Sequence, residues 1–152
     1  MSEVVKEAAE CIELVANLSS TGEKGGEEVA SGFRARARSI PSTLFTNGFT
    51  YTATLLAARG SRRLAELGFR NSCRSIVDEV VNVMRRGGVD AEELSYGLYE
   101  AILIYLLRSV GAVRATNFRD LITESIGNTA LDLRASQVAE WIKRFAEAYI
   151  EK

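Results

Sequence analysis

The stretch PSTLFTNGFTYTATLLAAR, residues 41–59, decides whether this chain contains a β-sheet. Its Asn47-Gly48 pair, between threonine- and phenylalanine-rich flanks, is a strong signal for a β-hairpin. However, a lone two-stranded hairpin is only marginally stable in water, and no other segment has a convincing strand pattern. Apolar residues in the same stretch also recur at helical spacing. A helix over 41–59 is therefore favoured, with Pro41 at its first position.

Gly48 would lie in the middle of that helix, on one side with Leu44, Thr52 and Leu56. A glycine inside a helix costs roughly 1 kcal/mol relative to alanine. We therefore expect the backbone of a neighbouring element to approach closely at Gly48.

Most of the remaining chain also shows apolar residues three and four positions apart, which is the period of an amphipathic helix. The length of 152 residues fits one domain, and the chain shows no internal repeat. The sequence thus predicts an all-α, single-domain helical bundle of six or seven helices over residues 1–152, with 61–67 as a short helical piece. The other expected helices cover residues 3–18, 27–38, 41–59, 70–86, 91–113, 117–126 and 129–150.

Several function classes are disfavoured by composition. The chain begins without a signal peptide, and its longest apolar run, Ala101 to Leu107, is far shorter than the roughly 20 residues of a membrane span. This predicts a cytoplasmic protein with no membrane contact.

There is no histidine, and neither a catalytic constellation nor a phosphate-binding loop is present, so we expect no enzyme activity, cofactor or metal. Cys11 and Cys73 are isolated and are interpreted as small buried hydrophobes rather than as a disulfide.

Charge is distributed unevenly along the chain. Residues 29–77 contain eight arginines and one acid, Glu66, for a net charge of +7, whereas the rest of the chain carries −8. Such a basic segment can bind a polyanion through one face, or its arginines can be solvated or paired with acids. The arginines are Arg34, Arg36, Arg38, Arg59, Arg62, Arg63, Arg70 and Arg74.

On a helix, Arg34 and Arg38 share a face while Arg36 points nearly opposite. Arg59, Arg62 and Arg63 are expected to cluster, and so are Arg70 and Arg74. Phosphate contacts by such residues would give salt-dependent, sequence-independent binding. The nearby aromatic residues are expected in the core rather than stacked on bases. They are Phe33, Phe45, Phe49, Tyr51 and Phe69.

Two blocks of the sequence resemble a known family. The first is RARARSIPSTLFTNGFTYTATLL, with a basic stretch, Ile40-Pro41, Asn47-Gly48-Phe49 and an apolar helix. The second is the ending ASQVAEWIKRFAEAYIEK, which includes Lys143 and Arg144. Together they resemble the small subunit of the Cmr complex, the type III-B CRISPR effector that targets RNA. The family has leucine where this chain has Ile40 and Phe49, and both are apolar exchanges.

The resemblance implies a noncatalytic subunit that stacks with its own copies into a filament beside the crRNA-binding backbone subunits. The assembly would hold the duplex of crRNA and target RNA during antiviral defence. It also implies that the Asn47-Gly48 segment is helical. As RNA-binding residues we carry over Arg34, Arg36, Arg38, Lys143 and Arg144 from the matched blocks, and Arg59, Arg62, Arg63, Arg70 and Arg74 from charge clustering alone.

Two other functions stay open at this point. The chain could be an all-helical protein–protein interaction module, whose arginines pair with acids and never contact RNA. It could also be a DNA-binding regulator, although no convincing recognition helix is present. Salt-dependent RNA binding distinguishes the first hypothesis from the second, and a preference for duplex DNA would favour the third.

Overall fold

The computed structural model describes residues 2–151, and within them it contains seven α-helices and no β-strand, which confirms the all-α prediction. Two short 3₁₀ turns, Asn17–Ser19 and Glu66–Phe69, follow α1 and α3. The helices are α1 (Ser2–Ala16), α2 (Gly26–Arg59), α3 (Arg62–Ala65), α4 (Cys73–Arg86), α5 (Ala91–Ser109), α6 (Phe118–Ser125) and α7 (Thr129–Tyr149).

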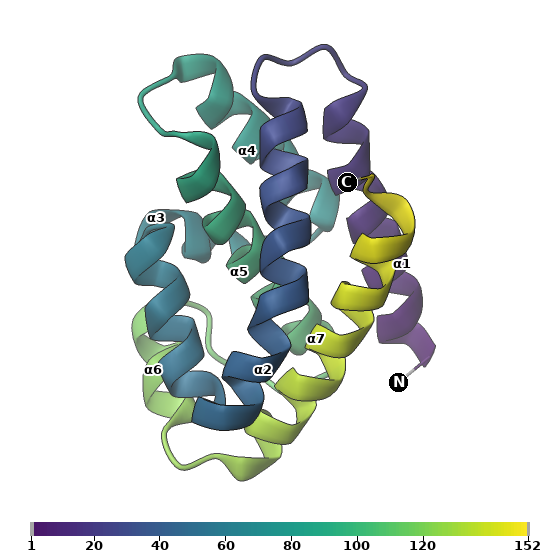
Figure 1. Ribbon diagram of the computed structural model, residues 1–152. Coiled ribbons are helices and arrows are strands. Elements are labelled where there is room, and N and C mark those ends of the chain that lie inside the picture. The colour runs from purple at the N-terminus through teal and green to yellow at the C-terminus, as the bar shows by residue number, and fades with distance from the viewer. Residues whose placement is uncertain (1, 152) are drawn as a thin grey trace.

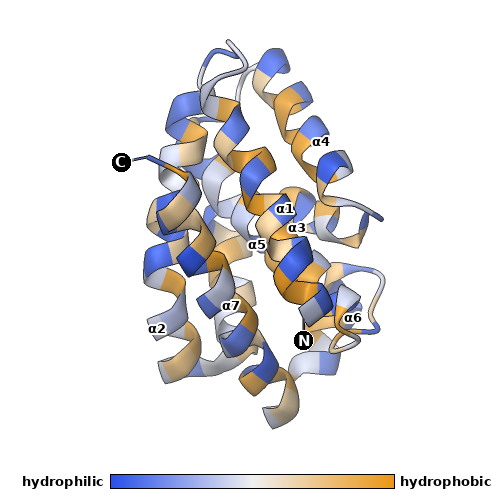
Figure 2. Cartoon of the chain, turned by 90° about the vertical axis from the view of Figure 1, so that its right-hand side faces the viewer, coloured by the Kyte–Doolittle hydropathy of each residue, from blue (hydrophilic) through white to orange (hydrophobic). Residues whose placement is uncertain are grey.

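Helix α5 is the central element, as its apolar sequence predicts. It packs against α1, α2, α3, α4 and α7, and Leu98, Ile102 and Leu106 on it are fully buried (Figure 1). Asp90 caps its start, because the Glu93 backbone N–H donates to Asp90 Oδ1 over 2.8 Å. The outer helices α1, α4 and α7 alternate hydrophobic and hydrophilic residues, as helices with one buried face must (Figure 2).

Helix α2 reverses direction at Gly48 instead of continuing to Arg59, so the prediction of one continuous helix over 41–59 is wrong. Gly48 has φ 83° and ψ 177°, a conformation open essentially only to glycine. In a straight helix, residues 36 and 59 would lie about 35 Å apart. Here the guanidinium carbons of Arg36 and Arg59 both lie within 6 Å of the Tyr96 ring centroid, at 4.2 and 5.8 Å. Figure 1 shows the second half of α2 running back beside the first.

The neighbour at Gly48 is a side chain rather than the backbone that we expected. A Cβ at this position would lie 3.3 Å from Asp132 Oδ1 on α7. The same oxygen accepts a 2.8 Å hydrogen bond from the Phe49 backbone N–H. Asp132 therefore acts as a cap for the second half of α2, supplied by an element 83 residues further along the chain.

Pro41 lies inside α2, so the prediction that it begins a new helix is also wrong. A proline within a helix removes a backbone hydrogen bond and costs roughly 3 kcal/mol. Ala37, Ile40 and Leu44 are buried on either side of it, at 0 to 3% exposure. Tertiary packing of this apolar stripe therefore holds the helix through Pro41.

Cys11 on α1 and Cys73 at the start of α4 form a disulfide, which corrects the interpretation of two isolated thiols. Both cysteines are buried, as expected, but their Cα atoms are 5.3 Å apart, within the range of a disulfide. The two residues are 62 positions apart in the chain, and the bond joins the first helix to the fourth.

The aromatic residues near the reversal of α2 divide between core and surface. Phe33 and Phe49 are buried and Phe69 is half-buried, in line with the core prediction. Phe45 and Tyr51 are 88% and 53% exposed, so for these two the prediction is wrong. They flank the turn at Gly48, and Phe45 borders a surface hollow with Asp132 and Leu133 of α7 instead of entering the core.

Candidate nucleic-acid interface

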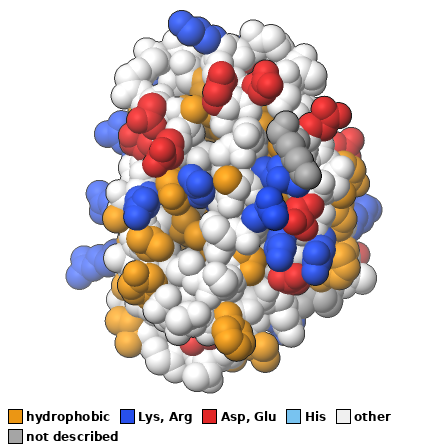
Figure 3. Space-filling model, viewed as in Figure 1, with side chains coloured by type: hydrophobic (Ala, Val, Ile, Leu, Met, Phe, Trp, Pro, Cys, Tyr) orange, Lys and Arg blue, Asp and Glu red, His pale blue; other side chains and the backbone are white. Residues whose placement is uncertain are grey.

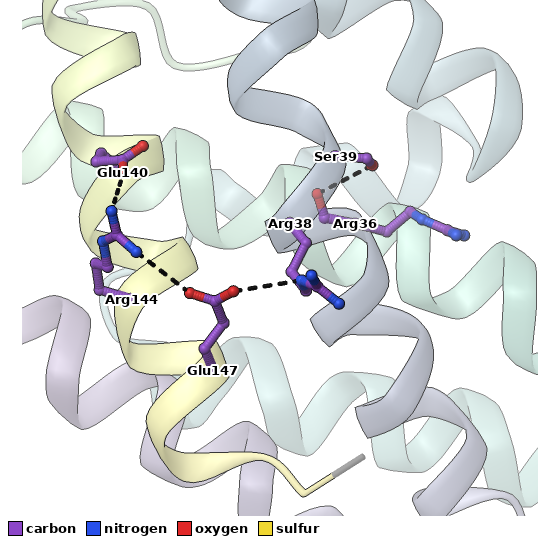
Figure 4. A network of polar contacts seen from close by, with 6 residues as sticks. All are labelled: Arg36, Arg38, Ser39, Glu140, Arg144 and Glu147. Atoms are coloured by element: carbon purple, nitrogen blue, oxygen red, sulfur yellow. Dashed lines mark hydrogen bonds and ion pairs between the residues drawn. The ribbon is translucent and has the colours of Figure 1, made fainter.

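The arginines of RARAR point to opposite sides of α2, as the helical period predicts. Arg38 faces α7, where its Nε lies 3.3 Å from Glu147 Oε2 (Figure 4). Arg36 lies on the α5 side, over the Tyr96 ring. Packed between α5 and α7, α2 therefore presents two separate basic surfaces.

The first surface, here called the α7 face, contains Arg38 and Arg144, with Arg34 one turn before Arg38 on α2 and Lys143 directly before Arg144 on α7. The Nε atom of Arg34 is buried and has no hydrogen-bond partner among the described residues. Arg144 lies 3.6 Å from Glu147 Oε1 and 3.2 Å from Glu140 Oε1, so Glu147 bridges Arg38 and Arg144. These side chains are partly exposed, and such pairs contribute little to stability. Their carboxylates nevertheless offset much of the positive charge on this face.

The second surface, here called the Tyr96 face, consists of Arg36, Arg59, Arg62, Arg63 and Tyr96. Arg36 and Arg59 both contact the Tyr96 ring, an arrangement stabilised by cation–π attraction. Among residues 2–151, no carboxylate oxygen lies within 4.0 Å of the side-chain nitrogens of these four arginines. The positive charge of this face is therefore not neutralised by direct ion pairs within the described chain. Acids do lie nearby, because Glu27, Glu28 and Glu92 line one hollow together with Arg36.

A close contact between two glycines builds the Tyr96 face. A Cβ on Gly60 would lie 2.6 Å from the Gly97 backbone nitrogen, so only glycine allows α2 to end against α5 at this point. Arg59 and Tyr96 directly precede these two glycines, and their side chains are thereby brought together.

A hollow of about 500 Å³ adjoins this face, between the start of α3 and the loop after α4. Arg62, Arg63 and Arg86 line it together with one acid, Glu93. Ser61 also lines the hollow and caps α3, accepting from the Leu64 backbone N–H over 3.1 Å. Arg86 makes a 3.7 Å ion pair with Glu79, so it is only partly available.

Arg70 and Arg74 lie apart from both faces. Arg70 Nη2 is 4.0 Å from Glu79 Oε2. Arg74 lines a different hollow, of about 410 Å³, that also holds Glu7, Glu10 and Glu13 of α1. A nucleic-acid strand would be repelled by those three acids. The ten predicted residues therefore do not form one surface.

Sequence reasoning missed Tyr96 and Arg86 as members of the site. Tyr96 lies in the apolar helix α5, whose pattern indicates only burial, and Arg86 lies outside the basic segment 29–77. Arg36 and Arg59 come near the same aromatic ring only because α2 reverses at Gly48. The sequence pattern does not predict that reversal.

Figure 3 shows the distribution of charge on one side of the molecule. Basic side chains gather on the right, over α2 and α7, where acidic side chains are interspersed (Figure 3). A second basic group lies on the left, toward α3, with acidic side chains directly above it. Among residues 2–151, no group of three histidine, cysteine or acidic side chains is placed to hold a metal ion. No helix of the described chain has the length and apolarity needed to cross a membrane.

Comparison with protein families gives one match, and it covers almost the whole chain. The model of the CRISPR-associated protein family Cas_Cmr5 matches residues 2–149. Neither the curated proteins nor the solved structures contain a significant match to the chain. The family match agrees with the resemblance seen in the two sequence blocks, and the chain therefore belongs to the Cas_Cmr5 family and is a small subunit of a CRISPR Cmr complex.

Proposed function

We propose that this subunit is noncatalytic and contacts RNA within a cytoplasmic Cmr effector complex. It would stack into a filament beside the crRNA-binding backbone subunits and help to hold the duplex of crRNA and target RNA. The observation that carries this proposal is the exposed arginine surface on α2 and α3, in a chain of the Cas_Cmr5 family. Guanidinium groups suit phosphate oxygens because their N–H donors form a planar fork.

Binding of labelled RNA to the Cmr complex should weaken with salt more steeply when this subunit is present than when it is omitted. Each phosphate neutralised by an arginine releases condensed counterions, which steepens the dependence of affinity on salt. Fluorescence anisotropy of complexes with and without the subunit, at several salt concentrations, measures the difference. Single-stranded RNA, the guide–target duplex and duplex DNA serve as probes. An unchanged slope for both RNA probes would contradict RNA contact.

A charge-reversing exchange such as Arg38→Glu is not the best variant for locating the RNA contact. Arg38→Glu would place a carboxylate beside Glu147 and so disturb the packing of α2 on α7. Neutral glutamine at Arg38 removes the positive charge without creating that repulsion. Loss of RNA binding by a glutamine variant is thus easier to separate from loss of structure.

The exposed apolar side chains suggest where copies of the subunit stack. Phe45, Ile126, Leu133 and Tyr51 are each more than half exposed, at 88, 68, 63 and 53%. Phe45 and Leu133 line one hollow of about 400 Å³ beside Gly48. Figure 3 shows apolar side chains at the lower end of the molecule, where α2 reverses. Contiguous patches of exposed apolar side chains commonly mark protein contacts.

Replacing Phe45 and Leu133 together by serine should reduce incorporation of the subunit into the complex. The apolar contact would be lost, whereas the fold should persist because neither side chain is buried. Quantitative co-purification with the backbone subunits measures incorporation, and circular dichroism checks the helices. Full incorporation of a folded variant would show that the filament contact lies elsewhere.

The second candidate is a protein–protein interaction module without RNA contact. The observation that favours it is the pairing of Arg38 and Arg144 with Glu147 and Glu140, which uses basic residues of both matched blocks. In that case the salt dependence of RNA binding would not change when the subunit is omitted.

A further inference from the structure

The two basic faces differ in how their charge is balanced. On the α7 face, Arg38 and Arg144 share Glu147, and Arg144 also reaches Glu140. On the Tyr96 face, the positions of Arg36 and Arg59 are set by an aromatic ring rather than by a carboxylate. An aromatic ring orients a guanidinium without cancelling its charge, whereas a carboxylate does both.

The arrangement at Tyr96 also holds two like charges close together. The guanidinium carbons lie 4.2 and 5.8 Å from one ring centroid, so they are at most about 10 Å apart and repel each other. The two arginines are brought together by the reversal of α2 at Gly48 and by the contact of Gly60 with Gly97. A ligand that places negative charge beside both groups would relieve the repulsion.

The positive surface continues beyond this pair. Arg62 and Arg63 follow Arg59 around the turn at Gly60 and line the hollow that Arg86 also borders. A single phosphate or a small anion would need only one or two of these groups. A run of arginines along the surface instead matches a ligand whose negative charges repeat at intervals, such as a nucleic-acid strand.

We propose that the Tyr96 face, and not the α7 face, is the surface that binds the phosphodiester backbone of an RNA strand. Arg36 and Arg59 would donate to phosphate oxygens while the Tyr96 ring holds their guanidinium planes, and Arg62 and Arg63 would contact phosphates further along the strand. The α7 face instead joins α7 to α2 through Glu147. This inference rests on the proposed function, because it identifies the RNA-contacting surface.

The test compares two variants with the same change in net charge. Arg36→Gln/Arg59→Gln removes two charges from the Tyr96 face, and Arg38→Gln/Arg144→Gln removes two from the α7 face. Each is assembled with the other Cmr subunits and titrated with labelled single-stranded RNA at several salt concentrations. We expect the first variant to bind roughly tenfold more weakly and to lower the slope of log affinity against log salt by about 1.4, the value for two lost phosphate contacts. The second should change both quantities much less.

Substitution of Tyr96 tests the role of the ring separately. Tyr96→Leu removes the aromatic face and should weaken RNA binding, whereas Tyr96→Phe keeps the ring and should bind like the wild type. Circular dichroism and incorporation into the complex confirm that each variant is folded. Equal binding by the phenylalanine and leucine variants would show that the ring does not position the arginines for RNA.

Failure of this inference and failure of the proposed function give different results. If omitting the subunit flattens the salt dependence but the Arg36/Arg59 variant behaves like the wild type or like its α7-face control, the inference is overturned and RNA contact stands. If omitting the subunit changes neither affinity nor slope, both are overturned. If the Arg36/Arg59 variant is folded but no longer joins the complex, the face binds an acidic protein surface of the assembly and the inference is again overturned.

Discussion

Replacing Cys11 and Cys73 together by alanine should lower the free energy of unfolding by about 4 kcal/mol. The disulfide closes a chain segment of 62 residues, and a long closed loop restricts the unfolded chain strongly. A loss of this size is a large part of the 5–15 kcal/mol that is ordinary for a domain. Urea unfolding of the oxidised wild type and the double variant, followed by circular dichroism, measures it.

Reduction of the wild type is the matched control. The wild type in dithiothreitol should unfold at nearly the same urea concentration as the double-alanine variant, and dithiothreitol should not affect the variant. If oxidised and reduced wild type unfold at the same urea concentration, the bond contributes nothing and this part of the account is wrong. Disulfides are rare in cytosolic proteins except in those of hyperthermophiles, so the result also bears on the proposed location.

Replacing Glu100 by glutamine should remove a strong pH dependence of stability. Glu100 lies on the central helix α5 at 1% exposure, and neither of its carboxyl oxygens has a hydrogen-bond partner among the described residues. Burial raises the pKa of this carboxyl well above its ordinary value. Between the pKa of the unfolded carboxyl and the raised pKa of the folded one, the folded protein therefore holds a proton on Glu100 that the unfolded chain releases.

The direction of the effect follows from that difference in pKa. Below the pKa of the unfolded carboxyl, about 4.5, both states carry the proton and the burial of Glu100 adds no pH dependence. Above it, the free energy of unfolding should fall by about 1.4 kcal/mol per pH unit, until the raised pKa of the folded state is reached. Glutamine cannot ionise, so Glu100→Gln should lack this decline.

Urea unfolding of the wild type and Glu100→Gln at pH 5, 6, 7 and 8 measures the prediction. The difference in unfolding free energy between the two proteins should grow in favour of the variant as the pH rises. Because all other ionisable groups are shared, their contributions largely cancel in the difference. A difference that stays constant with pH would mean that Glu100 is ionised in the folded protein.

The helices of this protein could be predicted from the sequence because their apolar residues keep a regular period. That period correctly separated Arg36 from Arg38 on opposite sides of α2. Asp90 likewise carried its own local signal as the cap of α5. These features depend on residues within one or two turns of each other.

The reversal at Gly48 could not be predicted in the same way. Asn-Gly correctly signals that the chain turns, but it does not say whether strands or helices meet at the turn. What stabilises the turn here is Asp132, which caps Phe49 from the last helix. The pairing of Cys11 with Cys73 and the approach of Arg36 to Arg59 are also contacts between distant parts of the chain, and both depend on the complete fold.

Ultraviolet crosslinking can show whether this subunit contacts RNA through its arginine surface. The assembled complex, loaded with crRNA and target RNA, would be irradiated, digested and analysed by mass spectrometry for peptides joined to nucleotides. We expect crosslinks in the peptides that carry Tyr96 or the segment Arg59–Arg63. The absence of any RNA crosslink on this subunit, while the backbone subunits crosslink efficiently, would contradict this expectation.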